Sequence, residues 1–211
     1  MDNGSVLLQR VKRVLMRLFQ YLMALGKYFI PYGGPELRSW PGKIRRLGQF
    51  LKDKKIDRLL LVTGESLMQN GVIRPALDSL DEAGIDYSVL TFDSPITTDQ
   101  DVEEGYQVYV DRGREAILAI GGGTRIDCAK AIAARVARPE LPAAAIAGYM
   151  RVRRRIPALV VIPTSAGTGS EASIEAVVKD SVSQKNMTIH DINLIPRYVL
   201  LDPELLRTLP R

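Results

Sequence analysis

The feature that most constrains this 211-residue chain is a regular alternation of short apolar runs with segments of helical periodicity. Apolar runs with the length of buried strands cover 59–63, 87–92, 116–120, 158–162 and 198–201. Segments with helical spacing of apolar residues separate the first four runs, at 66–83, 99–113 and 124–137. This alternation is typical of a parallel sheet covered by helices. The sequence therefore predicts an α/β fold with a Rossmann-like parallel sheet.

A β-hairpin is expected between the last two apolar runs. Residues 173–179 and 187–190 have strand character, and they flank the polar turn segment 180–184. The predicted fold is therefore a parallel sheet with an added hairpin.

The N-terminal segment predicts an amphipathic helix that is separate from the α/β domain. Its apolar stripe is Leu8, Val11, Leu15, Leu18, Leu22 and Leu25, and basic residues lie largely off the stripe. These basic residues interrupt the apolar run, so it is no transmembrane span. We expect the helix to dock on its own domain or on a partner, in preference to weak contact of residues 5–25 with an anionic membrane surface. A segment rich in turn-forming residues follows over 31–41 and marks the entry to the folded domain. We therefore predict a helix and linker over 1–30 and a folded domain over 31–211.

Composition indicates the cellular compartment and argues against a nucleic-acid partner. The single cysteine, Cys128, excludes an internal disulfide framework, which favours a reducing compartment and hence the cytoplasm. The net charge of +5 is modest, and only 6% of the residues are aromatic. Nucleic acid is therefore not an expected partner, because single-strand-binding domains usually add aromatic platforms.

A glycine turn follows the apolar run at 116–120. Gly121, Gly122, Gly123 and Thr124 lead from this predicted strand directly into a predicted helix. Glycines allow an anion to approach the backbone, and the free N–H groups and positive dipole end of a helix favour a pyrophosphate. The spacing is neither GxGxxG nor a Walker loop. On these residues alone, a nucleotide site and a purely structural turn both stay open.

A second loop of small residues follows the apolar run at 158–162. In Pro163–Glu171, hydroxyl residues alternate with glycines, at what the fold predicts to be the same edge of the sheet. Hydroxyls and backbone amides can contact the ribose and nicotinamide of a dinucleotide there. Taken alone, this loop could also be a flexible turn.

Together, the two loops resemble the GGGS-x-x-D-x-AK and PTTAGTGSE motifs of the iron-containing (group III) alcohol dehydrogenase family. The resemblance covers about residues 35–211 and includes the Leu201-Asp202-Pro203-Glu204-Leu205 segment. It implies a Rossmann-like domain with the dinucleotide phosphates at Gly121, Gly122, Gly123 and Thr124. It also implies that Thr164, Ser165 and Thr168 lie along the cofactor, with Asp127 near the nicotinamide and the substrate.

The resemblance implies hydride transfer between an alcohol and NAD or NADP, with a divalent metal such as Fe²⁺ or Zn²⁺ holding the alcohol oxygen. The family supplies an Asp and three His as ligands from an all-helical domain, which we expect beyond Arg211. The lone histidine, His190, is expected to be structural. This chain alone is therefore expected to be catalytically incomplete. A small alcohol or aldehyde is the expected substrate, and a homo-oligomer is an expected assembly.

Three positions depart from the family pattern. Gly64 stands at the end of the first predicted strand, where many members have an Asp that bonds the ribose of NAD. Ile96-Thr97 replaces an Asn-Pro, and Asn186, beside Lys185, replaces a frequent cofactor-side Lys. Because Gly64 presents no carboxylate to repel a 2′-phosphate, we predict that NADP(H) binds at least as well as NAD(H).

Other functions remain open on the sequence. A glycerol-dehydrogenase-like or dehydroquinate-synthase-like enzyme is an alternative within the superfamily, although the Pro163–Glu171 motif favours the alcohol dehydrogenases. A non-catalytic nucleotide-binding or scaffold module is the alternative from another class.

Overall fold

The computed structural model describes residues 16–17, 21, 33–39, 41–92 and 94–206. The chain divides into two units, Met1–Gly33 and Gly34–Arg211. In the first unit, Met16, Arg17 and Tyr21 are helical, and the rest of the amphipathic helix predicted there lies outside the described residues. No helix among the described residues is long and apolar enough to cross a membrane.

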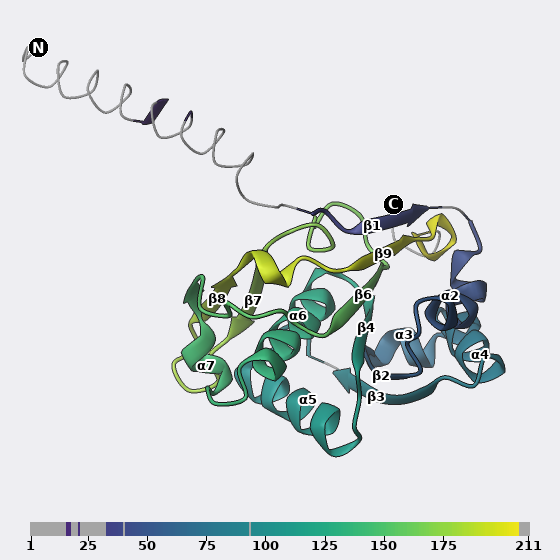
Figure 1. The fold of residues 1–211 in the computed structure, drawn as a ribbon, viewed down its shortest axis with the longest axis horizontal. Coiled ribbons are helices and arrows are strands. Elements are labelled where there is room, and N and C mark those ends of the chain that lie inside the picture. Colours follow the sequence, from purple (N-terminus) through teal and green to yellow (C-terminus); the bar gives the residue numbers. More distant parts are fainter. Residues whose placement is uncertain (1–15, 18–20, 22–32, 40, 93, 207–211) are drawn as a thin grey trace, which may run out of the picture. The chain divides into compact units, whose positions relative to one another are not determined.

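The second unit is built on a parallel sheet, as the sequence predicts (Figure 1). Its strand order is β1-β9-β6-β4-β2-β3, and every neighbouring pair is parallel. The strands are β1 (Glu36–Ser39), β2 (Arg58–Gly64), β3 (Asp86–Phe92), β4 (Ala116–Gly121), β6 (Ala158–Pro163) and β9 (Tyr198–Leu201). The central strands β2, β4 and β6 are buried along almost their whole length, which explains their continuous apolar runs.

Helices cover both faces of this sheet (Figure 1). One face packs against α5 (Asp99–Asp111) and α6 (Gly123–Ala137). The other face packs against α2 (Leu47–Asp53), α3 (Glu65–Gln69) and α4 (Arg74–Glu82), together with the short 3₁₀ turns η1 (Lys43–Arg46) and η3 (Pro203–Leu206). Strands β2, β4, β6 and β9 therefore each contribute alternate side chains to two separate apolar clusters.

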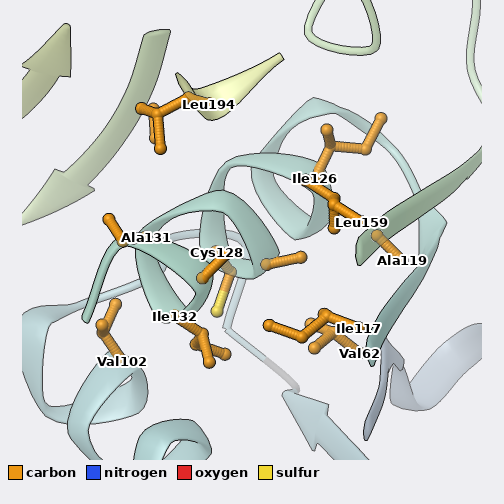
Figure 2. Packing of buried hydrophobic residues seen from close by; sticks show 14 of the residues in the cluster. Val62, Val102, Ile117, Ala119, Ile126, Cys128, Ala131, Ile132, Leu159 and Leu194 are labelled. Atoms are coloured by element: carbon orange, nitrogen blue, oxygen red, sulfur yellow. The ribbon is translucent and has the colours of Figure 1, made fainter. Parts of the chain in front are cut away.

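Helix α6 is the most deeply buried helix of the domain. Figure 2 shows Ile126 and Cys128 of this helix in one apolar cluster with Val62 and Ile117 of the sheet and Val102 of α5. All of these side chains are fully buried. The first turn of α6 is therefore fixed rigidly at the end of β4.

A second, three-stranded sheet contains the predicted hairpin. Strands β7 (Glu175–Lys179) and β8 (Asn186–His190) pair antiparallel, and β5 (Gly148–Tyr149) adds to β8. The short helix α7 (Ala143–Ile146) precedes β5, and the 3₁₀ turn η2 (Ile192–Leu194) follows β8. The predicted hairpin is thus confirmed, with its first strand beginning two residues later than expected.

One local prediction is wrong, and one strand lies where none was predicted. The helix expected over 66–83 is two helices, because the backbone turns at Gly71 with φ +67° and Pro75 lies in the first turn of α4. The turn-rich segment 31–41 contains strand β1, which pairs with β9 at the edge of the sheet. Strand β1 is polar and largely exposed, so it lacks the apolar run by which the other strands can be recognised.

Candidate functional site

The sheet has a topological switch point between β2 and β4. These neighbouring strands are joined by parallel pairing, and the Thr63 hydroxyl donates to the Ile120 carbonyl at 2.8 Å near their carboxyl ends. Strand β2 leads to α3 and α4 on one face, whereas β4 leads to α6 on the other. In open α/β sheets, ligands bind in the crevice that this divergence creates. Gly64 and Gly121 end the two strands and so border that crevice.

The glycine turn after β4 exposes backbone instead of side chains. Gly122 is the N-cap of α6 and provides no side-chain cap, and the N–H groups at the start of a helix are the ones that can bind an anionic ligand. A Cβ atom on Gly122 would lie 3.2 Å from Ser165 Oγ. A Cβ atom on Gly123 would lie 3.1 Å from the Thr168 side chain. The turn is therefore a tight cradle that a larger residue would fill.

The second loop, residues 164–174, is attached to the glycine turn at its start and to helix α6 at its end. At its start, the Thr164 N–H donates to the Gly121 carbonyl at 3.0 Å. At its end, Lys130 Nζ donates to Ser173 O at 2.6 Å, Ser173 Oγ at 2.9 Å and Glu175 O at 3.0 Å. Lys130 is fully buried, and burial lowers its pKa from the ordinary 10.5 to about 8. Helix α6 thus positions both loops.

Four of the predicted site residues line one cavity of about 300 Å³: Gly123, Thr124, Asp127 and Thr168. Asp127 Oδ2 accepts from the Val177 N–H at 3.2 Å, whereas its buried Oδ1 has no hydrogen-bond partner among the described residues. Burial raises the pKa of the Asp127 carboxyl. A buried acceptor without a partner favours a ligand that donates a hydrogen bond, such as a ribose hydroxyl or a carboxamide.

The other predicted site residues lie outside this cavity. Gly121 and Thr164 are buried at the base of the two loops. Ser165 lines a neighbouring cavity of about 290 Å³, together with Glu171 and Asp202. Gly64 ends β2 on the other side of the crevice.

Two of the family departures also lie at the first cavity. Thr97 is buried, and its hydroxyl donates to the Thr124 carbonyl at 3.4 Å, so this position contacts the first turn of α6 directly. Asn186 lines the cavity beside Lys179, its partner across the hairpin. The sequence reasoning missed Lys179, although the hairpin register would have placed it opposite Asn186.

The hydrogen-bonding groups of this site fit a dinucleotide. They combine a helix N-terminus framed by a glycine cradle, hydroxyl side chains and an unpartnered carboxylate oxygen. A metal does not fit: the described residues contain no group of three or more His, Cys, Asp or Glu side chains that could hold one. His190 instead pairs with Glu175 at 3.1 Å and stacks on Tyr149 at 4.4 Å between ring centroids.

The sheet, its switch point and the two joined loops define a Rossmann-like α/β protein. Residues 35–203 match the family described as iron-containing alcohol dehydrogenase. The chain belongs to the iron-containing alcohol dehydrogenase family, as the resemblance in its motifs indicates.

Individual relatives support this assignment over one part of their length. The chain is 32% identical to the NAD-dependent methanol dehydrogenase of Bacillus methanolicus over 85% of this chain and 46% of the relative. It is 28% identical to the lactaldehyde reductase of Escherichia coli K12 over 80% of this chain and 44% of the relative. A crystal structure of 1,3-propanediol oxidoreductase superposes with a TM-score of 0.78 at 27% identity, over 84% of this chain and 46% of that chain. The chain thus spans about half the length of the relatives that it matches.

Proposed function

We propose that this chain is the cofactor-binding half of an NAD(P)-dependent alcohol dehydrogenase or aldehyde reductase. The observation that carries the proposal is the contact between the two glycine-rich loops at the switch point, over a cavity lined by Thr124 and Asp127. The N-terminus of α6 would bind the pyrophosphate. Asp127 Oδ1 would accept a hydrogen bond from the ribose or the nicotinamide carboxamide.

Hydride transfer to or from an alcohol also requires stabilisation of alkoxide charge, which a bound divalent metal supplies in this proposal. The described residues do not provide a ligand set for it. We therefore propose that the 211 residues bind cofactor but need a further metal-holding part, on the same or another chain, to act on a small alcohol or aldehyde.

One purified preparation tests both parts of this proposal. NAD(H) and NADP(H) are titrated into the 211-residue chain, which is then assayed with short alcohols and aldehydes in the presence of Fe²⁺ or Zn²⁺. We expect binding without turnover. Metal-dependent turnover of about 1 s⁻¹ or more would contradict the second part. Absence of dinucleotide binding would contradict the first and would favour a scaffold role.

We further propose that the chain binds NADP(H) at least as tightly as NAD(H). Gly64 at the end of β2 leaves no carboxylate to bond the ribose hydroxyls or to repel a 2′-phosphate. In a Gly64→Asp variant, the affinity ratio of NADP to NAD should fall by about 10- to 100-fold, the effect of about 1–3 kcal/mol from one charged contact. An unchanged ratio would show that this position does not face the adenosine ribose.

A further inference from the structure

Arg125 lies where three neighbouring strands end, beside Gly64 of β2, Phe92 of β3 and Gly121 of β4. It lies in the first turn of α6 and is only 9% exposed. A Cβ atom on Gly121 would lie 2.8 Å from both Cβ and Cγ of Arg125, so the glycine at the end of β4 makes room for the arginine stem. The side chain then extends beneath the ends of β2 and β3.

Backbone carbonyls hold the guanidinium in place. Arg125 Nη2 donates to Phe92 O at 3.0 Å and to Ser94 O at 2.5 Å, where β3 ends. The guanidinium carbon also lies 5.5 Å from the centroid of the Phe92 ring. Because the helix, the glycine contact and the carbonyls all fix this side chain, little conformational entropy remains to be lost when it contacts a ligand.

The same guanidinium borders Gly64. Among the described residues, the atoms nearest to a Cβ placed on Gly64 are Arg125 Nε at 3.6 Å and Ser66 Oγ at 3.8 Å. Arginine Nε carries a hydrogen-bond donor, and the serine hydroxyl can donate as well. A group entering beside Gly64 therefore meets one fixed cation and one adjustable donor. That combination suits an anion with several acceptor oxygens.

We propose that Arg125, assisted by Ser66, binds the 2′-phosphate of the adenosine ribose and so makes this site selective for NADP(H). The inference rests on the proposed function, because it takes the ligand of the crevice to be a dinucleotide whose ribose lies at the end of β2. Gly64 gives the phosphate room, and Arg125 supplies the charge that recognises it. The 2′-hydroxyl of NAD gains no comparable charge-assisted contact.

The test compares the dissociation constants of NADP⁺ and NAD⁺ for the wild-type chain and for Arg125→Met, by isothermal titration calorimetry. Arg58→Met is the matched control, because it removes the same charge from the opposite end of β2, where the side chain is 55% exposed. Arg125→Met should weaken NADP⁺ binding by about 10- to 100-fold and change NAD⁺ binding by less than about threefold. The control should bind both cofactors like the wild type.

An equal change for the two cofactors in a folded Arg125→Met chain, or no change, would overturn the inference. Failure of the wild type to bind either cofactor would instead overturn the proposed function. If the variant does not fold, the wild-type chain is titrated with adenosine 2′,5′-bisphosphate and with 5′-AMP. The bisphosphate should bind about tenfold or more tightly, and equal affinities would overturn the role of Arg125.

Discussion

Single residues of α6 connect the two loops of the site, and Lys130 shows this most clearly. Its ammonium group donates three hydrogen bonds to Ser173 and Glu175, which lie more than 40 residues further along the chain. These contacts satisfy two backbone carbonyls that would otherwise lose hydrogen bonds. The cost is a positive charge in a fully buried position.

This cost predicts a pH dependence of stability. The pKa of Lys130 is about 8 in the folded chain and 10.5 when unfolded, so between these values the unfolded chain binds more protons. Stability attributable to Lys130 therefore rises with pH across that window and is constant below it. The free energy of unfolding of the wild type, minus that of Lys130→Met, should increase by up to about 3 kcal/mol from pH 8 to 10.5.

Urea unfolding of both chains across this pH range measures the difference. Lys185→Met, which removes an exposed lysine from the turn of the hairpin, controls for the loss of one positive charge. If the free energy of unfolding of the wild type minus that of Lys130→Met stays constant or falls with rising pH, burial of the Lys130 charge does not lower stability as proposed.

The glycine turn could be predicted from the sequence because a strand, a turn and a helix follow one another directly. Asp127 was indicated only by the family motif. The roles of Lys130 and Arg125 could not be predicted. Their partners lie 31 to 45 residues away, and only the tertiary fold brings them together: Arg125 reaches the carbonyls where β3 ends, and Lys130 reaches the start of β7. The motif marked Lys130 without indicating what it binds.

At the scale of elements, α2 and α4 approach so closely that only a glycine fits in α2 at the point of contact, which is position 48. A Cβ atom on Gly48 would lie 2.0 Å from the Ser79 carbonyl oxygen, which belongs to the backbone of α4 and cannot rotate away. Gly48→Ala should therefore lower the free energy of unfolding by about 1–3 kcal/mol despite the higher helix propensity of alanine.

Chemical denaturation of Gly48→Ala beside Gly34→Ala checks this prediction. Gly34 is exposed and has nothing within 4 Å of an added Cβ among the described residues, so its substitution should change stability by less than about 0.5 kcal/mol. Equal stability of the two variants would mean that α2 can move away from α4 without cost.

The N-terminal segment, for which the sequence predicts an amphipathic helix, belongs to a separate unit, and we propose that it is dispensable for cofactor binding. Residues 34–211 form a compact unit of their own. Deleting residues 1–26 should leave NADP(H) affinity and the cooperative unfolding transition intact. It should abolish any binding to vesicles that contain anionic lipids, because the basic residues are then gone. Loss of folding on deletion would show instead that the helix belongs to the core of the domain.

Strands that are buried on both faces could be predicted from the sequence, whereas the edge strand and the break between α3 and α4 could not. Strands β2, β4 and β6 have continuous apolar runs because helices cover both sides of them. The edge strand β1 has one half-buried and three exposed residues, so its sequence carries no such pattern. Its position next to β9 depends on pairing across about 160 residues of chain.

For the whole molecule, the central claim is that the switch-point crevice binds the pyrophosphate of NAD(P) at the first turn of α6. The domain has the fold of the corresponding half of its relatives, and Gly64, Gly121, Gly122 and Gly123 lie at the ends of β2 and β4, where the crevice is expected. The claim is tested best by a substitution that blocks the anion site and leaves the fold intact. Gly122 offers one, because it is the N-cap of α6 and aspartate is a favoured N-cap residue. The nearest atom to its added Cβ is the Ser165 hydroxyl oxygen at 3.2 Å, which ends a side chain that can rotate away.

The measurement is the dissociation constant of NADPH, followed by nicotinamide fluorescence, for the wild type, Gly122→Asp and the exposed control Gly34→Asp. The aspartate at position 122 should cap the helix, so the thermal midpoint should not fall. Its carboxylate would occupy and repel the phosphate position, so the affinity should fall by at least about tenfold. The control should bind like the wild type. NADPH affinity that is the same in all three chains would contradict the placement of the cofactor at this turn.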